Sequence, residues 1–237
     1  KIVEVLTKPN VYRNASGQPG HQFWKQEVEY EIDVALDEDA QRISGTETIR
    51  YQNNSPDTLG YLWLQLDQNR FRSDSIGNMS STFTGSSPDS GSPARISLGQ
   101  LRALQYSEDA ELGYEINSVR DSSGNDLTHT IVGTLMRIDL ARSLNSGQAV
   151  EFEIDYAYNI VNGDVLRPRG GYEYFPDDEN EGGNYLFAIS QWFPRLVAYT
   201  DYEGWTNREF LGSGEFTLEF GDYEVSLTVP SDHIVAA

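Results

Sequence analysis

The chain has 237 residues, no cysteine and a formal net charge of −20, from 37 acidic and 17 basic residues. The lack of cysteine excludes disulfides and thiolate zinc sites, and so acidic a chain would repel a phosphate backbone, so nucleic acid is not an expected partner. No apolar run reaches the roughly 18 residues of a membrane-spanning helix, and the first residues are too short and too acidic for a signal peptide.

Alternating apolar and polar residues mark the first elements. Every second residue from Val28 to Leu36 is apolar, and the alternation resumes from Ile43 to Tyr51. A period of two is typical of half-buried strands, and Asp37–Asp39 between them has turn composition. The sequence therefore predicts a hairpin over residues 26–52, followed by a turn at residues 53–57 and a short strand at 61–66.

The rest of the chain is also predicted to consist mainly of β-strands. No segment has a sustained apolar period of 3.6 residues, and residues 97–106 are expected to form a single helical turn at most. Asp121–Asp126 has the composition of a hairpin loop. Further strands are predicted near 113–120, 130–140, 149–158, 185–190 and 216–229. The predicted fold class is all-β, with long loops and little helix.

Two irregular stretches interrupt the strands. Residues 73–94 are rich in Ser, Gly, Thr, Pro and Asn, and residues 162–184 contain an acidic run. Because strands of one kind lie on both sides of 73–94, this stretch is expected to be a flexible loop inside one domain, not a linker. The predicted organisation is an amino-terminal arm over residues 1–21 and one β domain over 22–237.

Metal ligands are sparse. The three histidines, His21, His129 and His233, have no metal-ligand spacing, so no metal site is predicted within this chain. The acidic run from Asp177 to Glu181 has oxygens that calcium prefers, but a solvated acidic loop is the favoured interpretation. Asp121–Asp126 is likewise better explained as a β-turn.

Aromatic residues gather near the carboxyl-terminal part of the chain. Trp192, Phe193, Tyr199, Tyr202 and Trp205 surround Pro194 and Arg195 in the sequence. Core packing is the favoured interpretation. The alternative is an aromatic rim of Trp192, Tyr202 and Trp205 that contacts a substrate or a neighbouring domain.

Several segments together resemble a known family. Tyr30–Asp37 and Arg42–Tyr51 resemble the opening hairpin of the M1 zinc aminopeptidases, and Asn53–Leu59 with Leu62–Asn69 resembles their bacterial branch. Trp192–Pro194, Gly214–Phe216 and Asp222–Pro230 are similar to the last strands of the family's amino-terminal domain. The resemblance covers most of residues 22–230 and is weakest over 73–110.

The resemblance implies a saddle-like, mostly antiparallel β-sandwich that packs on a zinc-containing catalytic domain and walls its substrate cleft. The catalytic motifs of the family, Gly-x-Met-Glu-Asn and His-Glu-x-x-His, are absent from these residues. No catalytic residue and no cofactor is therefore assigned to this chain, which is expected to be inactive alone, with zinc held by the missing catalytic domain.

The resemblance also implies a substrate contact. In the family a glutamine of the amino-terminal domain helps to hold the free α-amino group of the peptide, and Gln191 is the nearest candidate by position. Glu203 and Asp201 are anionic alternatives. The expected partners are the downstream catalytic domain and a peptide substrate, and the expected location is the bacterial periplasm or cell envelope. The alternative function is a stand-alone β-sandwich module that binds carbohydrate or protein.

Overall fold

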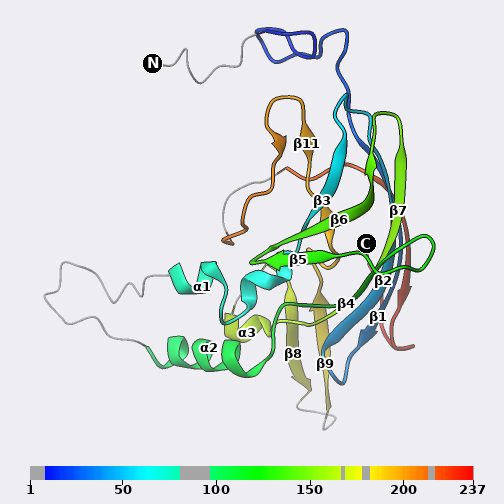
Figure 1. Cartoon of the computed structure of the whole chain (residues 1–237). Helices are drawn as coiled ribbons and strands as arrows, with labels where there is room; N and C mark the ends of the chain where they lie inside the picture. Colours follow the sequence, from blue (N-terminus) through cyan, green and yellow to red (C-terminus); the bar gives the residue numbers. More distant parts are fainter. Residues whose placement is uncertain (1–8, 81–96, 167–168, 178–181, 213–216, 237) are drawn as a thin grey trace, which may run out of the picture.

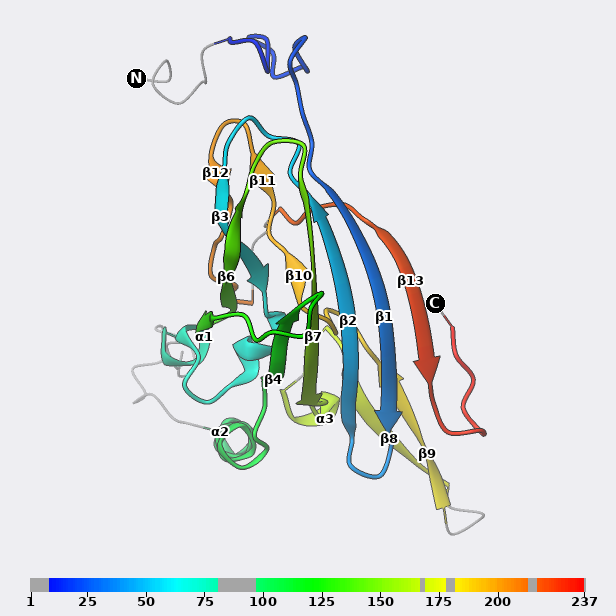
Figure 2. The same ribbon diagram turned by 45° about the vertical axis from the view of Figure 1, so that its right-hand side comes forward.

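A computed structural model describes residues 9–80, 97–166, 169–177, 182–212 and 217–236. Its body consists of two β-sheets packed in layers, confirming the all-β prediction (Figures 1 and 2). The larger sheet has the strand order β13–β1–β2–β7–β4. Its strands are β1 (Glu27–Asp37), β2 (Arg42–Gln52), β4 (Tyr114–Asp121), β7 (Ala149–Asn159) and β13 (Asp222–Thr228).

The second sheet has the order β10–β3–β6–β5. Two further pairs, β11 with β12 and β8 with β9, lie outside both sheets. The strands of the second sheet are β3 (Leu59–Gln65), β5 (His129–Val132), β6 (Leu135–Leu144) and β10 (Arg195–Leu196). Those of the two pairs are β8 (Gly171–Asp177), β9 (Gly182–Ala188), β11 (Tyr199–Thr200) and β12 (Gly204–Trp205).

The predicted opening hairpin is present, with β1 antiparallel to β2. In β1 the alternation seen in the sequence becomes alternating burial, since Val28, Tyr30 and Ile32 point into the core and the acidic residues between them are exposed. The core lies between the two sheets, because Ile49 and Ile154 of one sheet belong to the same buried cluster as side chains of the other, such as Leu62, Leu64 and Ile138. Burial of these side chains is the main stabilising contribution.

Two strand predictions need correction. The predicted strand 130–140 is split into β5 and β6 by a turn at Gly133, whose φ of 56° is left-handed. The last strand begins at Asp222 instead of 216 and pairs in parallel with β1, with Tyr30 opposite Tyr223. A parallel neighbour far away in sequence leaves no turn signal between the two strands.

The single helical turn predicted for 97–106 is wrong. The structure has a helix of 12 residues, α2 (Leu98–Asp109), which starts with a capping box between Ser97 and Gln100. No residue of α2 is buried, so the helix does not need the apolar periodicity that would have revealed it. Figure 1 places α2 with the short helices α1 (Ile76–Ser80) and α3 (Gly163–Leu166) at one end of the sheets.

The long loops also differ from expectation. Residues 81–94 of the predicted loop 73–94 lie outside the described residues, and α1 occupies part of its beginning. The stretch 162–184 contains α3, all of β8 and the start of β9, whose hairpin extends from the body (Figure 2). Residues 178–181 of the acidic run are not described, so the calcium alternative stays untested.

Asp121–Asp126 forms the predicted hairpin turn, which an antiparallel bridge between Arg120 and Asp126 closes. The Asp121 carboxylate accepts hydrogen bonds from the backbone N–H of Ser123 and Asn125, both at 2.9 Å. After this turn the chain crosses from β4 to β5, which belongs to the other sheet. Among the described helices none is long and apolar enough to span a membrane.

Candidate functional site

Three consecutive polar residues are buried where β3 ends. Asp67, Gln68 and Asn69 begin the 3-10 helix η2 (Asp67–Phe71) and are only 1%, 8% and 2% exposed. They follow the buried residues Leu64, in β3, and Leu66, so the tight turn directs polar groups into the interior. Buried polar side chains require hydrogen-bond partners, and these partners come from distant segments.

Asp67 forms an ion pair with Arg195, the first residue of β10. The Asp67 side chain is 1% exposed and that of Arg195 is 23% exposed. Burial raises the pKa of Asp67 above its usual value, although the neighbouring guanidinium acts in the opposite direction. Loss of Arg195 would therefore leave a desolvated carboxyl without its charge partner.

Gln68 holds the loop between β9 and β10. Its Nε2 donates to the backbone oxygens of Ser190 and Gln191, both at 3.0 Å, and the Tyr114 hydroxyl donates to the Gln191 oxygen at 3.0 Å. Gln191 itself has a φ of 55°, in the left-handed region that residues with a Cβ rarely adopt. Such a conformation persists only where surrounding contacts determine it.

The Gln191 side chain points to the same buried carboxylate. Its Nε2 lies 3.5 Å from Oδ1 of Asp67, while Arg195 pairs with Oδ2. With its NH₂ end directed at Asp67, the amide has its oxygen available as the acceptor end. The group formed by Asp67, Gln68, Tyr114, Gln191 and Arg195 is called the Gln191 cluster below.

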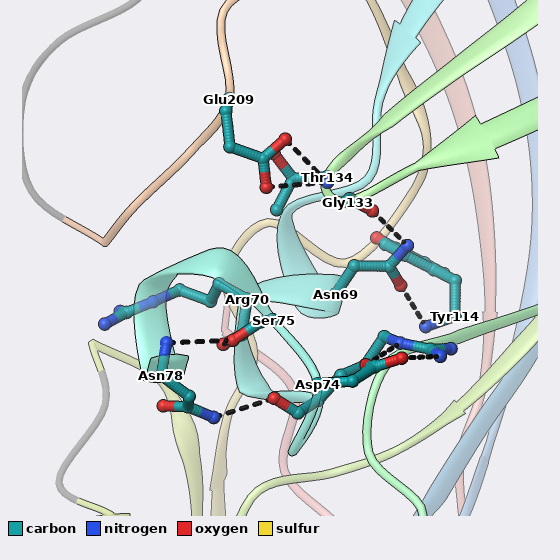
Figure 3. Close-up of polar contacts among 10 residues, drawn as sticks. Asn69, Arg70, Asp74, Ser75, Asn78, Tyr114, Gly133, Thr134 and Glu209 are labelled. Atoms are coloured by element: carbon teal, nitrogen blue, oxygen red, sulfur yellow. Dashed lines mark hydrogen bonds and ion pairs between the residues drawn. The ribbon is translucent and has the colours of Figure 1, made fainter. Parts of the chain in front are cut away.

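A second polar network fixes η2 from its other side (Figure 3). Asn69 accepts from the backbone N–H of Tyr114 at 2.7 Å and donates to the Gly133 oxygen at 2.9 Å. The Glu209 carboxylate accepts from the Thr134 N–H at 3.0 and 3.1 Å. A Cβ at Gly133 would lie 2.4 Å from that carboxylate, which would have to shift, and the φ of 56° at this position also favours glycine.

The second predicted contact, Glu203, lies elsewhere in the fold. It occupies the turn between β11 and β12 and pairs with Arg208. The side chain of neighbouring Asp201 is 2% exposed and accepts from Nε of Arg13 at 2.8 and 2.9 Å, which ties the amino-terminal arm to this turn. Within the described residues no hydrogen bond or ion pair joins Glu203 to Gln191, so the two candidates do not form one site.

The three residues of the predicted aromatic rim have different surroundings. Trp205 is half-buried and stacks on Tyr51, at 6.3 Å between ring centroids. Trp192, also half-buried, packs edge-on against Phe193 at 4.7 Å. Tyr202 is 53% exposed and lies beneath the Arg13 guanidinium. Packing against the core, the favoured interpretation, therefore describes both tryptophans better than an open binding platform.

One buried carboxyl lies apart from these networks. Glu47, in the middle of β2, is fully buried, and neither oxygen has a hydrogen-bond partner within the described residues. Burial raises the pKa of Glu47 well above its usual value, because desolvation disfavours the charged carboxylate. The phenol groups of Tyr30 and Tyr156 interact with it electrostatically.

A cavity of about 340 Å³ lies between α3 and the β8–β9 hairpin. Its polar lining includes Asp164, Arg169 and Glu173, and no residue of the Gln191 cluster contributes to it. Neither this cavity nor the roles of Asp67 and Gln68 could be predicted from local sequence patterns, because the partners of these two residues are up to 128 residues away. The one available hint was a polar run directly after an apolar strand.

Comparison with known proteins gives a similarity to solved structures only. No protein-family model matches the chain, and no curated protein matches it. An M1 zinc metallopeptidase from Deinococcus radiodurans is 13% identical, with a TM-score of 0.42, over 90% of this chain and 34% of that one.

Two related structures give similar values. A mutant of the Deinococcus radiodurans enzyme bound to a Tyr-Ser-Ala substrate is 11% identical, with a TM-score of 0.40, over 90% of this chain and 34% of that chain. A two-domain M1 zinc metallopeptidase mutant bound to L-tryptophan is 11% identical, with a TM-score of 0.41, over 90% of this chain and 35% of that chain. The chain thus spans about a third of the length of structures from the family that its sequence resembles.

Proposed function

We propose that this chain is the non-catalytic amino-terminal domain of a zinc aminopeptidase, and that Gln191 accepts a hydrogen bond from the free α-ammonium group of the peptide substrate. In this proposal the domain packs on a catalytic domain that holds the zinc, and walls its substrate cleft. A periplasmic or cell-envelope location belongs to the same proposal.

The geometry of Gln191 carries the proposal. A left-handed backbone held by Gln68 and Tyr114 presents the side chain in one orientation, and Asp67 attracts its NH₂ end. The amide oxygen is then the group that accepts from an ammonium donor. A preorganised acceptor of this kind binds a cation without first reorganising its own loop.

The net charge of the chain is consistent with binding the positively charged amino terminus of a peptide. A net charge of −20 attracts a positively charged amino terminus. The anionic neighbour Asp67 lies behind the Gln191 amide, where its pairing with Arg195 keeps it from replacing the substrate contact. Gln191 therefore supplies a neutral acceptor in an acidic field.

Exposed apolar residues support the docking part of the proposal. Tyr223, Val225 and Leu227 of the edge strand β13 are 49%, 41% and 47% exposed, and Phe175 and Leu186 of the β8–β9 hairpin are 51% and 53% exposed. Exposed apolar side chains gathered on single elements are typical of surfaces that pack on another domain. The half-buried tryptophans favour this role over the alternative of a carbohydrate-binding module.

The test is a kinetic comparison in the full-length protein. Gln191→Ala should lower kcat/KM for aminoacyl anilides by about 10-fold to 100-fold, because a hydrogen bond to a charged group is lost. The exposed residue Gln22 provides the matched control, and Gln22→Ala should leave kcat/KM unchanged. Equal kinetics for wild type and Gln191→Ala would refute the role of Gln191.

A further inference from the structure

A histidine and two carboxylates from distant parts of the chain meet at the end of the β1–β2 hairpin. Glu38 belongs to the turn after β1, and Asp232 and His233 follow β13. One possible ligand atom from each of the three residues lies within 4.8 Å of the other two. The cluster shares no residue with the Gln191 cluster.

The His233 ring is fixed in place by packing and by its backbone. Its side chain is 18% exposed, and its ring lies 5.9 Å from that of Phe187 in β9. The backbone N–H of His233 donates to the Pro230 oxygen at 3.1 Å, closing a turn that directs the ring back toward the hairpin. The ring therefore needs little rearrangement to act as a ligand.

The two ring nitrogens face different carboxylates. Nδ1 lies 3.3 Å from Oδ1 of Asp232, within hydrogen-bond range. Nε2 lies 3.7 Å from Oε2 of Glu38, too far for a hydrogen bond. Nε2 is buried and has no hydrogen-bond partner within the described residues, which a buried ring nitrogen ordinarily requires.

These distances suit a metal ion better than a direct contact. Nitrogen and oxygen ligands at about 2.0–2.2 Å from a zinc ion lie about 3.4 Å apart at the tetrahedral angle and further apart at wider angles. Histidine ligands commonly donate their other ring N–H to a carboxylate, which fixes the tautomer. Asp232 lies beside Nδ1 and can accept its hydrogen bond, and Glu38 lies beside Nε2, at the position of a second metal ligand.

We propose that Nε2 of His233 and the carboxylate of Glu38 bind a divalent transition-metal ion of the zinc class, with Asp232 accepting a hydrogen bond from Nδ1. Water completes the coordination. The bound ion joins the segment after β13 to the β1–β2 turn and thereby fastens the parallel edge strand.

The test is a calorimetric titration of this chain with Zn²⁺ alone. We expect one saturable site per chain. His233→Ala and Glu38→Gln should each weaken binding at least about 10-fold, and Asp232→Asn should weaken it about 10-fold to 100-fold, as loss of a supporting carboxylate does. Glu151→Gln is the matched control, because it removes one exposed carboxylate opposite Arg50, at the other end of β2. It should bind Zn²⁺ as wild type does.

A second measurement needs no variant. Co²⁺ should broaden the ring proton resonances of His233 before those of His21 and His129 in the NMR spectrum of the wild-type chain. Uniform broadening of all three histidines, or Zn²⁺ binding that is equal in all variants, would mean only diffuse attraction to an acidic surface and would overturn the proposal. If His233 and Glu38 form only a direct ion pair, the titration should show no saturable Zn²⁺ binding, and this result would also overturn the proposal.

Discussion

Gln68 donates hydrogen bonds from one side-chain nitrogen to the backbone of Ser190 and to that of Gln191, both at 3.0 Å. A residue in the helix after β3 thus determines the conformation of a loop more than 120 residues further along the chain. Because Gln191 has a left-handed backbone, this contact decides where its side-chain amide points.

Replacement of Gln68 tests that dependence. Gln68→Met keeps the approximate volume but removes both hydrogen bonds, so the part-buried Ser190 oxygen loses this donor and the Gln191 oxygen keeps the Tyr114 hydroxyl. The free energy of unfolding should fall by about 1–3 kcal/mol, measured by urea denaturation. Gln22→Met, at an exposed position, should change stability by less than about 0.5 kcal/mol. Similar stabilities for the two variants would contradict the assigned role.

The left-handed conformation of Gln191 is itself testable. Gln191→Gly and Gln191→Ala both delete the amide, but only glycine adopts a φ near 55° without steric cost. The glycine variant should therefore be more stable than the alanine variant by roughly 1 kcal/mol, measured in the same denaturant series. If the alanine variant is as stable as the glycine variant, Gln191 does not have a left-handed backbone conformation.

The Asp67–Arg195 pair predicts a non-additive result. Arg195→Met alone leaves a buried carboxyl without its partner and should destabilise the chain by about 3 kcal/mol. The double variant Asp67→Leu with Arg195→Met removes the stranded charge and should recover a substantial part of that loss. Equal and additive losses in thermal or chemical unfolding would show that the two side chains are not energetically coupled.

Glu219 predicts a dependence of stability on pH. Burial raises its pKa to about 7 from 4.5, despite a hydrogen bond from the Tyr199 N–H and the nearby Lys25 charge. The folded state therefore binds this proton more tightly than the unfolded state does, and the stability contributed by protonation is lost as pH rises from 4.5 to 7.

Glu219→Gln removes that titration and keeps an oxygen acceptor for Tyr199. Relative to wild type, the variant should gain up to about 3 kcal/mol of unfolding free energy on going from about pH 4.5 to about pH 8. Urea denaturation of both proteins at the two pH values checks this. If the difference in unfolding free energy between wild type and variant is the same at both pH values, the prediction is wrong.

The sequence predicted the parts of the fold that local patterns encode. The β1–β2 hairpin was found because its alternation extends from Val28 to Leu36 and from Ile43 to Tyr51, with a turn between the two segments. Helix α2 was underestimated because a surface helix with a capping box needs no apolar stripe. The parallel partner of β1 could not be predicted, since pairing between Tyr30 and Tyr223 depends on the whole tertiary structure.

The candidate site, too, could be predicted only where the sequence itself carries a signal and not where tertiary packing decides. Gln191 was singled out through family resemblance, and its surroundings in the structure give it a defined orientation. Asp67 and Gln68 were missed because a polar pair after a strand normally lies in solvent, and only tertiary packing reveals its burial. Glu203 was chosen for its charge alone, and it lies in a separate turn paired with Arg208.

The central claim, that this chain is the amino-terminal domain of a zinc aminopeptidase, is tested most directly by sequencing the coding region beyond the codon for Ala237. The account predicts an in-frame continuation that encodes Gly-x-Met-Glu-Asn and then His-Glu-x-x-His. A stop codon, or a continuation without these motifs, would contradict it.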